Sequence, residues 1–166
     1  MNQKDSHKNK PVTYYRIESM DRYSGETFGG FMAAVYSSLA LILDMRPDEL
    51  DIVDLIWVSK KSNLKAYELY TLSLELVKDL PILDFYKADT YNYICLYRKK
   101  EYERFKNNLK RINEIVMETT HNIMMLILKK MNLKDNELVY KDSYQVVIDR
   151  NTYLKHNDNK RFELFD

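Results

Sequence analysis

The sequence predicts an α+β fold that is predominantly helical. Three observations lead to this prediction: one long stretch has helical periodicity, three short stretches are rich in β-branched and aromatic residues, and apolar residues make up 45% of the 166 residues. This apolar share is ordinary for a globular protein, and the length corresponds to one domain. We therefore expect four or more helices and a small sheet built from strands near 12–18, 91–97 and 138–148.

The domain organisation follows from composition. Residues 1–11 are polar and end at Pro11, which predicts a disordered tail. A single globular domain is expected over 12–150, followed by a partly ordered C-terminal tail over 151–166. The strand over 12–18 opens the domain because its residues are mostly β-branched or aromatic.

A glycine-containing loop and three helices are expected in the next part of the chain. Residues 19–30 hold every glycine of the protein and predict a loop, and the apolar run 31–43 predicts a deeply buried helix. Pro47 suits the first turn of a second helix, which is expected to run to about Val58.

A third helix is expected near 64–79, with Ser62 or Asn63 as its N-cap. We expect its buried stripe to consist of residues at helical spacing, namely Tyr67, Tyr70, Leu74 and Val77.

The clearest pattern is a heptad-like seam that predicts one long helix over 99–132. Apolar positions recur there at alternating steps of three and four: Tyr102, Phe105, Leu109, Ile112, Val116, Thr119, Ile123 and Leu126. A helix of this length would outrun a compact core. We expect a bend at Thr119–Asn122, where weak helix formers occur without Gly or Pro.

Two strand predictions flank this helix. The apolar run over 91–97 is continuous, which predicts a central strand. Two short strand-like runs within 138–148 are separated by Asp142 and Ser143, which favour a turn.

No catalytic residues, no metal site and no cofactor are predicted. His7, His121 and His156 have no Cys or second His at ligand spacing, so a zinc site is not expected. Cys95 is the only cysteine, which excludes an internal disulfide and favours a reducing, cytoplasmic setting. Acidic residues at helical spacing are interpreted as solvated surface rather than a metal site: Asp48, Asp51 and Asp54.

The charge distribution gives the main candidate for a binding surface. Net charge is +1 overall, but residues 98–111 hold seven bases and two acids. On a helix, one stripe would consist of Lys100, Arg104, Asn107 and Arg111, with Lys106 and Lys110 to one side. Either another protein or a nucleic acid could contact such a surface, with tyrosines supplying stacking for the latter: Tyr91, Tyr93 and Tyr97.

The glycine loop gives a second candidate site. Gly25, Gly29 and Gly30 lie between a predicted strand and a predicted helix, the order in which phosphate-binding loops occur. Glu26 in the loop and Arg16 on the strand would be its polar partners. No P-loop lysine follows and the spacing is not GxGxxG, so close packing at the glycines is the competing interpretation.

Three hypotheses about function stay open. The favoured one is a non-catalytic protein-binding or regulatory protein, such as an inhibitor of a host defence enzyme carried by a phage or mobile element of a low-GC bacterium. In this hypothesis the partner is another protein or a second copy bound through the 99–132 helix. The alternatives are a nucleic-acid-binding accessory protein using residues 98–111 and a small enzyme or phosphate binder using Gly25–Gly30. A membrane location is not expected, because no apolar run approaches the roughly 20 residues that span a bilayer.

Overall fold

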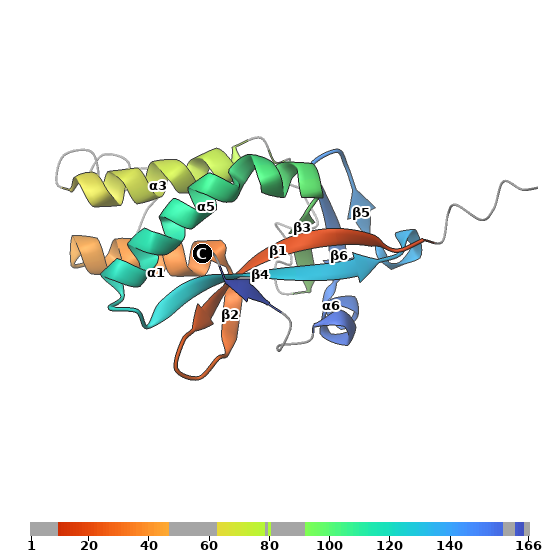
Figure 1. Ribbon diagram of the computed structural model, residues 1–166, viewed down its shortest axis with the longest axis horizontal. Helices are drawn as coiled ribbons and strands as arrows, with labels where there is room; N and C mark the ends of the chain where they lie inside the picture. Colours follow the sequence, from red (N-terminus) through yellow and green to blue (C-terminus); the bar gives the residue numbers. More distant parts are fainter. Residues whose placement is uncertain (1–9, 47–62, 79, 81–91, 158–161, 165–166) are drawn as a thin grey trace, which may run out of the picture. The chain divides into compact units, whose positions relative to one another are not determined.

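A computed structural model describes residues 10–46, 63–78, 80, 92–157 and 162–164 (Figure 1). The α+β prediction is confirmed. The elements in chain order are β1 (Val12–Asp21), β2 (Thr27–Gly30), α1 (Phe31–Leu43), α3 (Leu64–Val77), β3 (Tyr93–Tyr97), α5 (Lys99–Thr119), β4 (Met124–Leu133), the 3₁₀ turn η2 (Asp135–Glu137), β5 (Tyr140–Lys141), β6 (Gln145–Asp149), α6 (Arg150–His156) and β7 (Glu163–Leu164).

The sheet is larger than the three predicted strands. It has seven strands, in the order β5-β6-β3-β1-β4-β7, and β2 pairs with β1 off this path. The pairs β1–β2, β1–β3, β3–β6, β4–β7 and β5–β6 are antiparallel. The prediction that β3 is central is confirmed, because it lies between β6 and β1.

The chain forms two compact units. The first unit consists of residues 1–16, 80–104 and 129–162, and the second of residues 17–79, 105–128 and 163–166. Strand β1, helix α5 and strand β4 each contribute residues to both units.

The core of the first unit is formed by strands β3 and β6 and helix α6. Ile94 pairs with Ile148 and Leu96 with Val146 across the two strands. These four side chains are buried together with Tyr153 of α6. The Asp149 carboxylate caps α6 by accepting a hydrogen bond from the Thr152 N–H (2.7 Å).

The second unit contains α1, α3 and most of α5, and α1 packs against α3. The predicted bounds of the helix over 31–43 are confirmed. The expected deep burial holds for one part of this helix, including Ala34, Val35 and Leu39, but not for Leu41, which is 60% exposed. The Asn63 cap of α3 is confirmed: its side chain accepts hydrogen bonds from the Lys65 and Ala66 N–H groups at 2.9 and 3.2 Å.

The predicted apolar stripe of α3 needs a correction. The buried residues are Ala66, Leu69, Tyr70, Ser73 and Leu76. Of the predicted stripe, only Tyr70 is buried, and Tyr67 is 37% exposed. The predicted stripe contains only large side chains and leaves out Ala66 and Ser73, although small residues allow close approach between packed helices.

The predicted helix over 99–132 is correct as far as Thr119 and wrong beyond it. His121 and Asn122 have φ angles of 51° and 63°, the left-handed conformation that ends many helices. The Asn122 N–H then donates to the Met117 carbonyl (2.7 Å) instead of continuing the helical pattern. The expected bend is therefore a helix end, and the apolar run that follows is the strand β4.

The seam itself is confirmed over the true helix. Its members from Tyr102 to Val116 are buried: Tyr102, Phe105, Leu109, Ile112 and Val116. Because the seam is covered within the chain, it is not the exposed stripe that dimerisation through this helix would use.

Two predicted irregular regions contain regular structure. The expected loop over 19–30 is a β-hairpin, because β1 continues to Asp21 and β2 pairs with it. The polar region after residue 150 begins with helix α6 and ends with β7. Of the predicted tail over 1–11, residues 1–9 lie outside the described residues, as does the helix predicted from Pro47 to about Val58.

Candidate interaction face of helix α5

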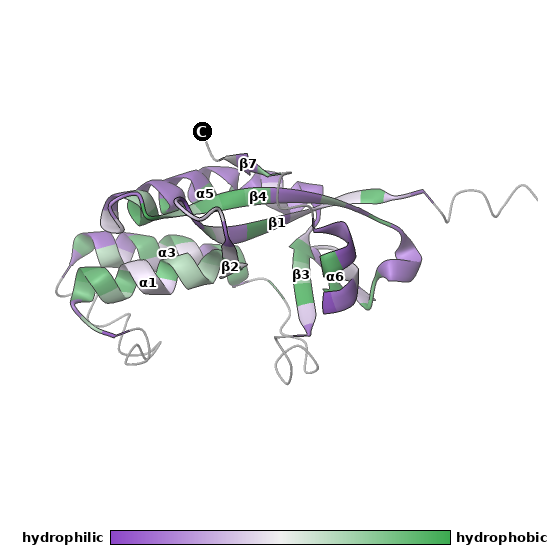
Figure 2. Cartoon of the chain, turned by 90° about the horizontal axis from the view of Figure 1, so that it is seen from below, coloured by the Kyte–Doolittle hydropathy of each residue, from purple (hydrophilic) through white to green (hydrophobic). Residues whose placement is uncertain are grey.

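Helix α5 presents a charged face opposite its buried seam. Figure 2 shows the helix largely in the hydrophilic colour, in contrast to the green stretches of β3. The predicted stripe is exposed throughout: Lys100, Arg104, Asn107 and Arg111. The arrangement follows from the sequence. The stripe has the same steps of three and four as the seam but lies about half a turn away around the helix, so its residues point away from the core.

Both arginines of the predicted stripe take part in ion pairs within the chain. Arg104 Nη2 lies 3.0 Å from Glu101 Oε2, and the Glu101 side chain is only 5% exposed. Arg104 therefore has a structural role, because its positive charge compensates a buried carboxylate.

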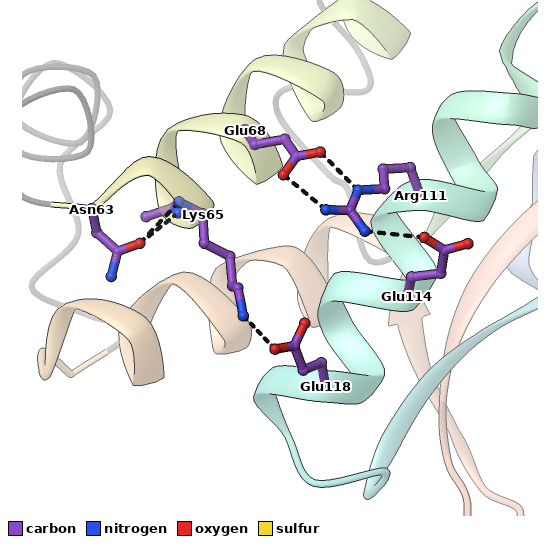
Figure 3. Close-up of polar contacts among 7 residues, drawn as sticks. Asn63, Lys65, Glu68, Arg111, Glu114 and Glu118 are labelled. Carbon is purple, nitrogen blue, oxygen red and sulfur yellow. Dashed lines mark hydrogen bonds and ion pairs between the residues drawn. The ribbon is translucent and has the colours of Figure 1, made fainter.

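Arg111 connects α5 to α3 (Figure 3). Its Nε and Nη2 atoms donate to the two carboxylate oxygens of Glu68 at 2.7 and 3.0 Å, and Nη1 donates to Glu114 at 3.1 Å. The hydrogen bond from Arg111 lowers the pKa of Glu68, and Glu68 raises the pKa of Arg111. Lys65 of α3 pairs with Glu118, which lies about two helical turns after Arg111 on α5. These exposed pairs fix geometry more than stability, since such pairs contribute about 0–1 kcal/mol.

Four lysines of α5 remain without an ion pair or hydrogen bond to any part of the chain that the structure describes. They are Lys99, Lys100, Lys106 and Lys110, which are all exposed. We call this set the lysine face. Lys99, Glu103, Lys106 and Lys110 follow each other at steps of four, three and four and form a single stripe.

The lysine face was only partly predicted. Lys100, Lys106 and Lys110 are among the predicted contact residues, whereas Lys99 was missed. Lys99 and Lys100 lie in the first turn of α5, where the helix dipole opposes a positive charge by about 0.3–1 kcal/mol. Because the predicted helix also begins at residue 99, the sequence already placed Lys99 at this unfavourable position, and that was a signal for including it among the contact residues.

The aromatic side chain within the basic stretch of α5, Tyr102, is buried instead of exposed for stacking. Tyr102 stacks on Tyr15 with ring centroids 4.8 Å apart, and both are buried. Tyr93 and Tyr97 are half-buried, and Tyr91 lies outside the described residues. Tyr15 and Tyr102 therefore offer no ring on which a base of a single-stranded nucleic acid could stack.

The loop that contains Gly25 is a hairpin turn whose backbone donors are used internally. The Tyr23 and Ser24 N–H groups donate to Asp21 Oδ1 at 2.8 and 2.9 Å. The Gly25 N–H donates to the Asp21 carbonyl and the Glu26 N–H to Ser24 Oγ. The hydrogen bonds from the Ser24 and Tyr23 N–H groups to its carboxylate lower the pKa of Asp21. A phosphate nest needs such N–H groups to be available, so this turn offers little for an anion.

The glycines and Arg16 serve separate structural roles. Gly29 has a φ angle of 82°, which favours glycine, and Gly30 is the N-cap of α1. Ser19 Oγ donates to the Gly30 carbonyl and accepts from the Ala34 N–H, at 2.8 and 3.0 Å. In the first unit, Arg16 Nη1 donates to the Cys95 carbonyl (3.0 Å) and the guanidinium lies 5.7 Å from the Tyr153 ring centroid.

The described histidines and the cysteine lie on separate segments of the chain. His121 is exposed at the end of α5, and His156 Nε2 lies 2.7 Å from Glu137 Oε1. Cys95 is a half-buried free thiol. Within the described ranges, no three His, Cys, Asp or Glu residues are grouped so as to hold a metal ion. His7 and the predicted acidic triplet 48–54 lie outside those ranges.

Comparison with protein-family models, with curated proteins and with solved structures found no match. Among the helices that the structure describes, none combines the length and apolar character needed to cross a membrane.

Proposed function

We propose that the protein acts by binding another protein in the cytoplasm, with the lysine face of α5 as its contact surface. The observation that supports this is that the arginines and the lysines of one helix differ in their contacts within the chain. Arg104 and Arg111 are engaged within the chain, whereas the lysine face is exposed and has no ion pair in the described residues. A charged face on a helix that is packed against its neighbour is suited to steering and orienting a partner.

The narrower form of this proposal is a regulator, such as an inhibitor of a host defence enzyme carried by a phage or mobile element. The sequence motivates this form in two ways: it has only three glycines and three prolines but fourteen tyrosines, a usage typical of an AT-rich genome, and it has no known catalytic motif.

The direct test is affinity purification of the tagged full-length protein from cells of its own source, followed by size analysis of the reconstituted pair. We expect a protein partner in fixed stoichiometry, and reduced recovery with a Lys99→Ala/Lys106→Ala/Lys110→Ala variant. Lys141→Ala, which removes an exposed charge on β5, is the control and should leave recovery unchanged. Recovery of nucleic acid alone, or of nothing from a protein that stays monomeric, would contradict the proposal.

A further inference from the structure

We propose that the partner presents an acidic polypeptide segment to the lysine face, and that nucleic acid is not its ligand. This inference rests on the proposed function and adds the chemistry of the partner. It starts from the charges that α5 leaves exposed: four lysines, one acid (Glu103) and one amide (Asn107), all outside the ion pairs of the chain that the structure describes.

The spacing of the lysines fits a short segment. Along the helix axis, Lys99 and Lys106 are about 10 Å apart and Lys106 and Lys110 about 6 Å apart, from the rise of an α-helix. The stripe of about 16 Å therefore matches roughly five residues of an extended chain. It equally matches an antiparallel or parallel helix with acids repeated at steps of four and seven.

The type of cation sets how strictly the face selects the geometry of its ligand. The arginine fork binds carboxylates and phosphates through two parallel hydrogen bonds, and both arginines of this face are already bound to carboxylates, Arg104 to Glu101 and Arg111 to Glu68. The remaining cations are lysines, which act as point charges with flexible stems. A carboxylate on a mobile acidic segment can meet such charges without strict geometry.

Glu103 favours a polypeptide ligand over a nucleic acid. It is exposed and lies within the stripe between Lys99 and Lys106. A continuous phosphate backbone would be repelled at that position, whereas a polypeptide can place a basic or neutral residue there and so fix its register. Tyr102, the tyrosine within α5, is buried against Tyr15 and offers no exposed ring on which a base could stack.

The start of α5 strengthens the attraction for an anion. Lys99 and Lys100 lie beside the positive end of the helix dipole. Carboxylates of a partner would offset the repulsion of these two lysines by the dipole and by each other. Binding of an acidic segment would therefore reduce an electrostatic repulsion that is present in the isolated chain.

The test uses the full-length protein and two labelled probes of similar charge, poly-L-glutamate and oligo-dT, each about 20 units long to exceed the estimated stripe. Fluorescence anisotropy is measured at low and at physiological ionic strength. The face variant is Lys106→Glu/Lys110→Glu, and the control with the same net charge is Lys10→Glu/Lys134→Glu, at two exposed sites away from α5. Circular dichroism melts verify that both variants fold.

We expect poly-L-glutamate to bind more tightly than oligo-dT, and the face variant to weaken that binding about tenfold while the control changes it less than about twofold. Equal weakening by both variants, tighter binding of oligo-dT, or no binding of either probe would overturn the inference. A purified protein partner that is insensitive to the face variant would refute the acidic-segment inference and leave the proposed function standing. If the face variant weakens the binding of poly-L-glutamate but no protein partner can be recovered, the preference of the lysine face for carboxylates stands and the proposed function is refuted.

Discussion

Glu137 shows how single carboxylates organise the first unit. Its Oε2 accepts a hydrogen bond from the Lys134 N–H (2.9 Å), and its Oε1 lies 2.7 Å from His156 Nε2 and 3.8 Å from Lys155 Nζ. The side chain is only 17% exposed. The backbone hydrogen bond and then His156 lower the pKa of Glu137 below its ordinary value of 4.5. One carboxylate thereby ties the η2 turn to the last turn of α6.

A pH-dependent contribution to stability follows from Glu137. A carboxyl group with a lowered pKa stabilises the folded state above its ordinary pKa, and this contribution disappears as pH falls through the lowered value. We expect Glu137→Gln to lower the melting temperature at pH 7, and the difference from the wild type to shrink below about pH 4, near the ordinary pKa of glutamate. Thermal melts of both proteins across this range provide the measurement. A difference that stayed constant with pH would assign the effect to packing instead of charge.

At the residue scale, sequence reasoning found the charged positions of the site but not their roles. Lys106 and Lys110 were predicted as contact residues and lie on the lysine face. The engagement of Arg111 was not foreseeable, because its partner Glu68 is 43 residues away in the sequence. Local spacing contains no information about such a pair, and only the packing of α3 beside α5 creates it.

The element with the largest difference between prediction and structure is the segment after α5. The six apolar residues from Ile123 to Leu128 fit either a buried helix or a central strand, since periodicity does not separate the two. Gly and Pro are absent from this segment, but Asn122 adopts the left-handed conformation that Asn also tolerates. The Thr120 hydroxyl then accepts the Met124 N–H (3.1 Å) as β4 begins.

Asn113 fixes β4 against α5, and its removal is a sharp test of this arrangement. Its side chain is buried, and Oδ1 accepts the Leu126 N–H at 2.7 Å. We expect Asn113→Ala to leave that buried N–H unsatisfied and to lower the free energy of unfolding by about 1–3 kcal/mol.

Denaturant titration measures this change, with Asn107→Ala as the exposed control on the same helix. The control should change stability by less than about 0.5 kcal/mol. Equal effects of the two substitutions would show that the Asn113 hydrogen bond has no stabilising role.

At the scale of the whole molecule, the elements with strong local signals were the predictable ones. Helix α1 is an uninterrupted apolar run with the predicted bounds, and β3 is likewise continuous. Strands β2 and β7 have no such signal: β2 contains two glycines, and β7 has two residues. Both exist because a longer strand, β1 or β4, offers them an edge, which no local pattern reports.

The sharing of β1, α5 and β4 between the two units leads to a prediction about cooperativity. Unfolding either unit would unfold one part of each of these three elements, and the other part of each element belongs to the other unit. We expect a single unfolding transition, and both Leu96→Ala and Leu109→Ala to shift that transition by about 2–5 kcal/mol, since each removes a fully buried side chain. Denaturation followed by far-ultraviolet and tyrosine circular dichroism is the measurement. Two resolved transitions, each sensitive to only one substitution, would contradict this expectation.

The position of β1 in the sheet has a consequence for synthesis on the ribosome. This strand emerges early, yet it lies between β3 and β4, and β4 is complete only at Leu133. At ordinary translation rates of about 5–20 residues per second, roughly 6–20 s pass before its last neighbour is available. During that interval the hairpin with β2 covers one part of β1, while its apolar side chains, such as Tyr14 and Ile17, lack their final neighbours. The nascent chain is therefore most open to chaperones and to misassociation while its future central strand waits for β4.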